Sequence, residues 1–235
     1  MDRNQIEELL YQSLETEMGG VQIYTTAIRC AKNGDLKKEW KKYLEETKKH
    51  EKIMRRVCKS FGLDLQKETP GRKIVRHKGE SLVRAMEMAL ESGPSDAAQL
   101  VAAECVVEAE TKDHMNWELI GKVAKKLTGD EKKVLKEAHE EVEEQEDEHL
   151  YHTSGWAREL WIESLGIPAV LPPPEEEKDV KTAIGAARAK HARSKMVGGK
   201  HSHKSAGKKQ GSKKSPAKKA GSKKAAAKSS KKKSK

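Results

Sequence analysis

The sequence predicts an all-α protein, an antiparallel four-helix bundle followed by a basic tail. Four stretches of about 30 residues space their apolar side chains three and four positions apart, which places those side chains on one helix face. Short turn sequences group the stretches into two pairs, and a long crossover joins the pairs. After residue 179 the chain becomes rich in Lys, Ala, Ser and Gly, so it no longer resembles a folded core.

Composition limits the classes of function. The 235 residues are 36% charged and 4% aromatic. All 37 acidic residues lie at or before Asp179, whereas 20 of the 48 Lys and Arg residues follow it, which indicates a polyanionic partner. No apolar run approaches the roughly 20 residues that span a bilayer. The three cysteines, without Cys-x-x-Cys, are typical of a reducing compartment. We therefore expect a cytoplasmic protein with no membrane partner.

Three regions are expected. The bundle should occupy residues 1–171, and the segment 172–179 should form a stiff Pro/Glu hinge. Residues 180–235 should form a basic tail that is disordered, with a short helix at 180–196, because a highly charged segment without aromatics cannot bury a core.

The first helix is expected over residues 4–32. Its core stripe is Leu10, Leu14, Glu17, Val21, Tyr24 and Ile28, and a carboxylate interrupts it at Glu17. Asn33-Gly34-Asp35 reads as a turn with Asp35 as the N-cap.

The second helix should run from residue 35 to 61, and His50 interrupts its apolar stripe. Thr47 occupies the position three residues before His50, but Glu46 lies on the same face at i, i+4. His50 is either an ordinary core histidine or a metal ligand, and the helix alone does not decide between them.

The crossover, residues 62–94, reads as a loop followed by a short amphipathic helix over residues 80–91. The third long helix should begin at the cap Ser95-Asp96 and reach residue 127, with Glu110 in its core stripe. The fourth should run from the capping box Thr128/Glu131 to residue 165.

The fourth helix carries Glu146-x-x-His149 on its core-facing stripe. This spacing lets one helix offer a carboxylate oxygen and a ring nitrogen to a metal inside a four-helix bundle. The alternative is an acid-rich, solvated helix face in which the match arises by chance.

An internal repeat relates the two helix pairs. LETEMGGVQIY (residues 14–24) aligns with VEAETKDHMNW (residues 107–117), so that Glu17 matches Glu110. The second helices match with an offset of one residue. Each pair would then give one carboxylate from its first helix and a carboxylate plus an imidazole from its second.

Buried charges require partners, and four carboxylates with two imidazoles suit a dinuclear iron or manganese centre. The expected metal ligands are Glu17, Glu46, His50, Glu110, Glu146 and His149, with His114 and His152 as spare candidates. No catalytic residue is assigned beyond these ligands.

Residues 4–166 resemble the ferritin-like superfamily of di-iron carboxylate proteins, which includes rubrerythrins, bacterioferritins and related bacterial stress proteins. The motifs that carry the resemblance are Glu17-x6-Tyr24, Glu110-x6-Trp117 and Glu146-x-x-His149. The resemblance implies a ferritin-like bundle with a dinuclear centre, acting as a ferroxidase- or peroxidase-type oxidoreductase. Thr47 stands where the family has a carboxylate on the second helix, so a mononuclear or empty site is the alternative.

The tail is similar to linker-histone tails and to the basic tails of some bacterial nucleoid proteins, as in SPAKK (residues 215–219). Its lysines would neutralise phosphates and bind DNA independently of sequence, which implies association with the nucleoid. The expected nucleic-acid-binding residues are Lys208, Lys209, Lys213, Lys214, Lys218, Lys219, Lys223, Lys224, Lys228, Lys231, Lys232, Lys233 and Lys235.

The first functional hypothesis is therefore a di-metal protein that handles iron or peroxide and oxygen while its tail tethers it to DNA, protecting DNA under oxidative stress. The alternative is a non-catalytic, nucleoid-associated DNA-binding protein whose bundle only oligomerises. A third reading is a di-metal oxygenase or peroxidase with an incidental tail. A homo-oligomer is compatible with the sequence, and only the second reading requires one.

Overall fold

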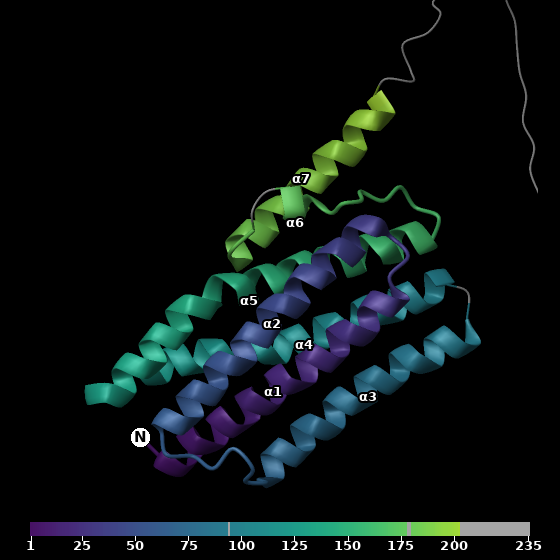
Figure 1. Ribbon diagram of the computed structural model, residues 1–235. Helices are drawn as coiled ribbons and strands as arrows, with labels where there is room; N and C mark the ends of the chain where they lie inside the picture. The colour runs from purple at the N-terminus through teal and green to yellow at the C-terminus, as the bar shows by residue number, and fades with distance from the viewer. Residues whose placement is uncertain (94, 178–179, 203–235) are drawn as a thin grey trace, which may run out of the picture. The chain divides into compact units, whose positions relative to one another are not determined.

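The computed structural model describes residues 1–93, 95–177 and 180–202 of the chain (Figure 1). Residues Met1–His201 form one compact unit. The described residues contain helices and no strand, which confirms the prediction of an all-helical protein. None of the helices in this described part is both long enough and apolar enough to cross a membrane.

The helices follow the predicted order closely. They are α1 (Arg3–Cys30), α2 (Gly34–Ser60), α3 (Pro70–Ser92), α4 (Ser95–Ala124), α5 (Gly129–Ser164), α6 (Pro174–Glu177) and α7 (Ala183–Ser202). The main difference is α3, which fills most of the crossover instead of residues 80–91 alone. It begins early because the Thr69 hydroxyl accepts a hydrogen bond from Arg72 N at 3.1 Å and Pro70 occupies the first turn.

Two predicted caps differ from the structure. Asn33, not Asp35, caps α2, since its side chain accepts from the backbone N–H groups of Asp35 and Leu36. Within the described residues, Thr128 makes no side-chain capping bond. Its expected partner Glu131 instead accepts a hydrogen bond from the Arg3 guanidinium at 2.5 Å, which ties the start of α5 to α1.

Four helices close into a ring. The hairpin α1–α2 packs against the hairpin α4–α5, because α1 contacts α4 and α2 contacts α5. The crossover helix α3 lies outside this ring against α1 and α4 (Figure 1). The four long helices thus share one interior, and α3 covers one of its seams.

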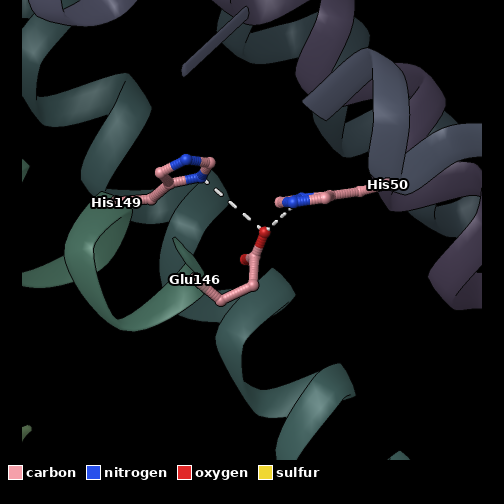
Figure 2. Close-up of side chains that lie close together, drawn as sticks. All are labelled: His50, Glu146 and His149. Atoms are coloured by element: carbon pink, nitrogen blue, oxygen red, sulfur yellow. Dashed lines mark ion pairs between the residues drawn. The ribbon is translucent and has the colours of Figure 1, made fainter. Parts of the chain in front are cut away.

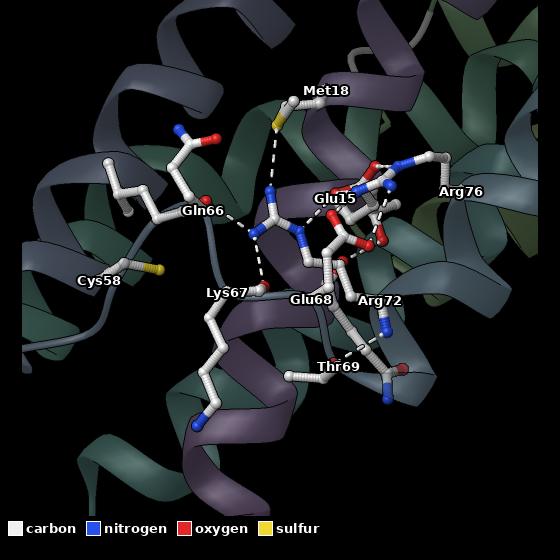
Figure 3. Close-up of polar contacts among 12 residues, drawn as sticks. Glu15, Met18, Cys58, Gln66, Lys67, Glu68, Thr69, Arg72 and Arg76 are labelled. Atoms are coloured by element: carbon white, nitrogen blue, oxygen red, sulfur yellow. Dashed lines mark hydrogen bonds and ion pairs between the residues drawn. The ribbon is translucent and has the colours of Figure 1, made fainter.

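A buried ion-pair network attaches α3 to α1 (Figure 3). Arg72 Nε and Arg76 Nε each lie 2.6 Å from a different oxygen of Glu15. Arg72 also donates to the carbonyls of Leu65 and Lys67 at 2.7 and 3.1 Å. Burial raises the pKa of Glu15, but the two guanidinium groups outweigh burial and lower it overall.

The bundle interior has two apolar clusters. One contains Tyr24, Tyr43, Val106 and Trp156, and the other contains Leu14, Met54, Trp117 and Val142. Each of the four long helices contributes to both clusters, and a polar layer lies between them along every helix. The apolar core is therefore interrupted by this polar layer at the same height in all four helices.

The expected hinge at 172–179 includes α6, whose Glu175 is buried and accepts two hydrogen bonds from Arg158 at 2.5 and 2.9 Å. Helix α7 begins three residues later than the expected helix at 180–196 and extends further. It is attached to α5 by Arg193 Nε, which lies 2.6 Å from Glu159 Oε1, and its Ala189 is fully buried.

Candidate metal centre

Six polar side chains from the four bundle helices form the layer between the apolar clusters. Each is at most 4% exposed although each carries an ionisable group. The six are Glu17 on α1, His50 on α2, Glu110 and Asp113 on α4, and Glu146 and His149 on α5. The predicted convergence of acids and imidazoles in the interior is therefore present in the structure.

These side chains gather into two overlapping groups. His50, Glu146 and His149 place one donor atom each within 4.8 Å of one another, and Glu17, Asp113 and Glu146 do the same. Figure 2 shows the first group: Glu146 Oε1 lies 2.8 Å from His50 Nδ1 and 3.7 Å from His149 Nδ1. Glu146 belongs to both groups and is the residue that they share.

Glu110 completes the layer from α4. Its Oε2 lies 3.7 Å from His149 Nδ1, on the side of that ring that faces Glu146. Glu110 is outside both three-residue groups but is adjacent to the first of them.

The layer has unpaired polar atoms that point into it. Among the described residues, the following buried atoms have no hydrogen-bond partner: Glu17 Oε2, Glu110 Oε2, Asp113 Oδ1, Glu146 Oε2, His50 Nδ1 and His149 Nδ1. The 2.8 Å approach of His50 Nδ1 to Glu146 is an ion-pair contact without hydrogen-bond alignment. Burying so many polar atoms unpaired is strongly unfavourable. Four carboxylates and two imidazoles are also the donor types that transition ions take, so this cluster fits metal binding.

The outer atoms of the same residues are held by fixed partners. His149 Nε2 lies 3.0 Å from Glu46 Oε2, and His50 Nε2 lies 2.7 Å from Gln145 Oε1. Metal-ligating histidines characteristically use their second nitrogen in this way, which fixes the ring orientation. Both rings therefore present Nδ1 to the interior.

Glu17 is oriented by the indole of Trp117, which donates from Nε1 to Glu17 Oε1 at 2.8 Å. The other oxygen of Glu17 is left facing the layer. Trp117 thus has a second role besides packing in the apolar cluster.

The electrostatics are those of crowded carboxylates. Burial, followed by repulsion from neighbouring acids, raises the pKa of Glu17 and of Asp113 well above the usual values, and raises the pKa of Glu146 to about 8. Burial lowers the pKa of His50. Burial also lowers the pKa of His149, but Glu110 and Glu46 outweigh it and raise that pKa to about 10.

Thr47 stands where the resemblance implies a carboxylate, and it is buried with its hydroxyl bonded to its own helix. Its hydroxyl donates to Tyr43 O at 2.9 Å in its own helix. Its Cγ2 would lie 3.0 Å from a methyl group placed on Gly20, so this glycine makes room for α2. Similarly, a methyl group on Gly79 of α3 would lie 3.9 Å from the Cα of Gly19.

The other predicted residues are distributed as follows. Glu46 lies behind His149 rather than among the inward-facing donors. His114 Nε2 lies 2.6 Å from Asp147 Oδ1, and His152 Nδ1 lies 3.0 Å from Glu39 Oε1. Neither histidine is a member of the two donor groups. The predicted lysines, from Lys208 to Lys235, lie outside the described residues.

Sequence reasoning missed Asp113. It is 4% exposed and lies three residues after Glu110 and four before Trp117, a spacing that continues the core stripe of α4. That spacing is the available signal, but a stripe that continues four residues after Glu110 places His114 on the inward face instead.

The fold and the cluster together define an all-helical protein with buried carboxylate and histidine side chains that could hold a metal ion. Comparisons of the chain with protein-family models, curated proteins and solved structures gave no match.

Proposed function

We propose that this chain is a ferritin-like protein with a dinuclear iron or manganese centre that handles iron, peroxide or oxygen, and that its lysine-rich tail tethers it to DNA. The observation that carries the metal part is the set of six buried, unpartnered donor atoms that four helices direct into one layer. The DNA tether rests on a different observation, the positive charge of the C-terminal region.

The arrangement of the helices supports the ferritin-like assignment. Two hairpins pack side by side, and a long crossover connects them. Two donor groups that share Glu146 suit two ions joined by a carboxylate. The total of four carboxylates and two imidazoles also equals the set implied by the resemblance, because Asp113 on α4 supplies the carboxylate that Thr47 on α2 lacks.

A bound pair of iron or manganese ions would supply electron exchange with dioxygen or peroxide, which amino-acid side chains alone do not provide. The six inward-facing residues would hold the pair. Glu46, Gln145 and Trp117 would fix the orientation of their partners in the layer. The apolar clusters on both sides would exclude bulk water and strengthen every charge interaction within the layer.

The tether rests on the charge of the C-terminal region. No acidic residue follows Asp179 in the sequence. In α7, the side chains of Arg188, Lys190 and Lys195 are exposed. Many lysines without apolar anchors favour a polyanion over insertion into a membrane. DNA binding by this segment would be independent of sequence and would weaken steeply with salt.

Metal content tests the first part. Full-length protein loaded with iron or manganese and then desalted should retain two ions per chain, and Asp113→Asn should retain fewer. Glu118→Gln, at an exposed position of the same helix, is the matched control and should bind as the wild type does. Wild-type protein that retains no ion would exclude the metal function and favour the non-catalytic DNA-binding alternative.

A gel shift at increasing salt tests the tether. A chain that ends at Ser202 keeps the compact unit, whose last residue is His201, and lacks the tail lysines. We expect the full chain to bind duplex DNA much more tightly than the shortened chain, and the difference to shrink as salt rises. Equal affinities of the two chains would exclude the tail as the tether.

A further inference from the structure

The two groups that share Glu146 differ in their donor chemistry. One has two imidazole nitrogens and a carboxylate, from His50, His149 and Glu146. The other has carboxylates alone, from Glu17, Asp113 and Glu146. If each group holds one ion, as the proposed function requires, the two ions face unlike surroundings.

We infer that the two positions select different metals: a nitrogen-preferring ion between His50 and His149, and a hard, oxygen-preferring ion between Glu17 and Asp113. The centre is then heterodinuclear, with Glu146 as the shared ligand. This inference rests on the proposed function and specifies which class of ion each position takes.

The segregation of the imidazoles is visible in the geometry. The rings of His50 and His149 lie nearly parallel, with centroids 5.7 Å apart and 29° between their planes. Both direct Nδ1 at Glu146, at 2.8 and 3.7 Å from Oε1 (Figure 2). His50 Nδ1 is 3.9 Å from Glu17 Oε2, so it lies closer to the shared Glu146 than to Glu17.

The surroundings keep this segregation in place. The ring of His149 is fixed by Glu46 and by the Tyr43 ring, whose centroid lies 4.2 Å away. The ring of His50 is fixed by Gln145. Rotation of either imidazole toward Asp113 would break these contacts. In the carboxylate group, the Trp117 indole holds Glu17 in place, and its ring centroid lies 6.4 Å from that of His50.

Ligand chemistry then assigns the ions. Two histidines and one carboxylate form the donor set typical of non-haem Fe(II) sites, and imidazole also suits Zn²⁺. Carboxylate oxygens without nitrogen suit Mn²⁺ and other hard ions. Affinity for nitrogen and oxygen donors generally rises from Mn²⁺ toward Zn²⁺. A limiting amount of the stronger binder should therefore fill the histidine position first and leave the carboxylate position to Mn²⁺.

The experiment uses Zn²⁺ and Mn²⁺ as probes on the full chain after treatment with a chelator. One equivalent of Zn²⁺ is added first, then excess Mn²⁺, and weakly held ions are removed by desalting. Metal analysis should find one Zn and one Mn per chain. The electron paramagnetic resonance spectrum should show isolated Mn²⁺, because its neighbour is diamagnetic.

Two variants separate the positions. His50→Gln should weaken Zn²⁺ binding by more than the about 10- to 100-fold that is typical when a residue that only orients a ligand is changed. Mn²⁺ should be retained. Asp113→Asn should lose Mn²⁺ and keep one Zn²⁺. Circular dichroism of both variants checks that the helices remain, and Glu118→Gln serves again as the control.

The outcomes are distinct. The inference would be overturned if the wild type bound two ions in any mixture of Zn and Mn and both variants lost the two metals in the same proportion. The dinuclear proposal would then still stand. Wild-type protein that binds neither ion would overturn both. One Zn and one Mn per chain, lost separately in the two variants, would support unequal positions.

Discussion

In the metal-free protein, replacing Glu146 with Gln should stabilise the fold at neutral pH, even though Glu146 is shared by both donor groups. Burial and repulsion from Glu110 raise the pKa of Glu146 from 4.5 to about 8. Between these pH values the folded protein therefore binds more protons than the unfolded chain. The resulting cost to stability is absent below about pH 4.5 and grows as the pH rises toward 8.

The magnitude follows from the same pKa values. At pH 7 the unfolded chain would ionise Glu146 while the folded protein keeps it protonated, and the 2.5-unit gap between pH 7 and 4.5 corresponds to roughly 3 kcal/mol. Gln has nearly the same shape and carries no charge, so it removes this cost. Glu17 and Asp113 lie in the same layer and share its protons with Glu146, so the three groups titrate together. The gain in the free energy of unfolding at pH 7 is therefore at most about 3 kcal/mol.

Urea unfolding of chelator-treated wild type and Glu146→Gln, at pH 5 and pH 7, measures the effect. The variant should gain less than about 1 kcal/mol at pH 5 and up to about 3 kcal/mol at pH 7. Added Mn²⁺ should reverse the order, since it stabilises only a protein that binds it. Glu118→Gln controls for loss of a surface charge. A metal-free variant that is less stable than wild type at pH 7 would refute the reasoning.

Three other changes have defined outcomes. Glu46→Gln should weaken metal binding about 10-fold with the number of ions unchanged, because Glu46 only orients a ligand; loss of an ion in metal analysis would make it a ligand itself. Arg72→Met should lower the free energy of unfolding by about 3 kcal/mol in urea titrations, since it leaves Glu15 buried with fewer partners; a change below about 0.5 kcal/mol would contradict this. Glu176→Gln should remove a loss of thermal stability that wild type shows as the pH rises from 4.5 toward 9, because burial and Glu39 raise the pKa of Glu176 to about 9; equal pH profiles of the two proteins would count against it.

Much of the site could be predicted because each bundle helix has a regular apolar stripe. A charged residue within such a stripe must face the interior, and this rule located Glu17, His50, Glu110, Glu146 and His149, all of which are buried. The rule depends only on helix periodicity, so it needs no knowledge of which helices are neighbours.

The rotation of α4 could not be fixed in the same way. Asp113 and His114 are adjacent, and both fall within a turn of Glu110. In the structure the buried Val106 and Trp117 set the rotation so that Asp113 faces inward, while His114 reaches Asp147 near the surface. Adjacent residues point about 100° apart around the helix axis. Which of the two faces the interior is therefore decided by how the helix packs.

The role of Glu46 required a different kind of information. Its position beside His50 on α2 suggested that it joins the same ion. It instead contacts His149 of α5, across the interface between the two hairpins. The contacts between the two hairpins depend on the axial offset between their helices. Helix periodicity does not determine this offset.

The two hairpins also divide the donors unequally. The repeat predicts three from each pair, but α1 and α2 supply only Glu17 and His50, and α4 and α5 supply the other four. The carboxylate absent at Thr47 is replaced by Asp113, so the number of donors is kept while their distribution changes. That exchange places a carboxylate in the group with Glu17 and Glu146, whereas both imidazoles belong to the group that Glu146 forms with them. The same departure from symmetry that leaves a threonine in α2 therefore makes the two donor groups chemically unlike.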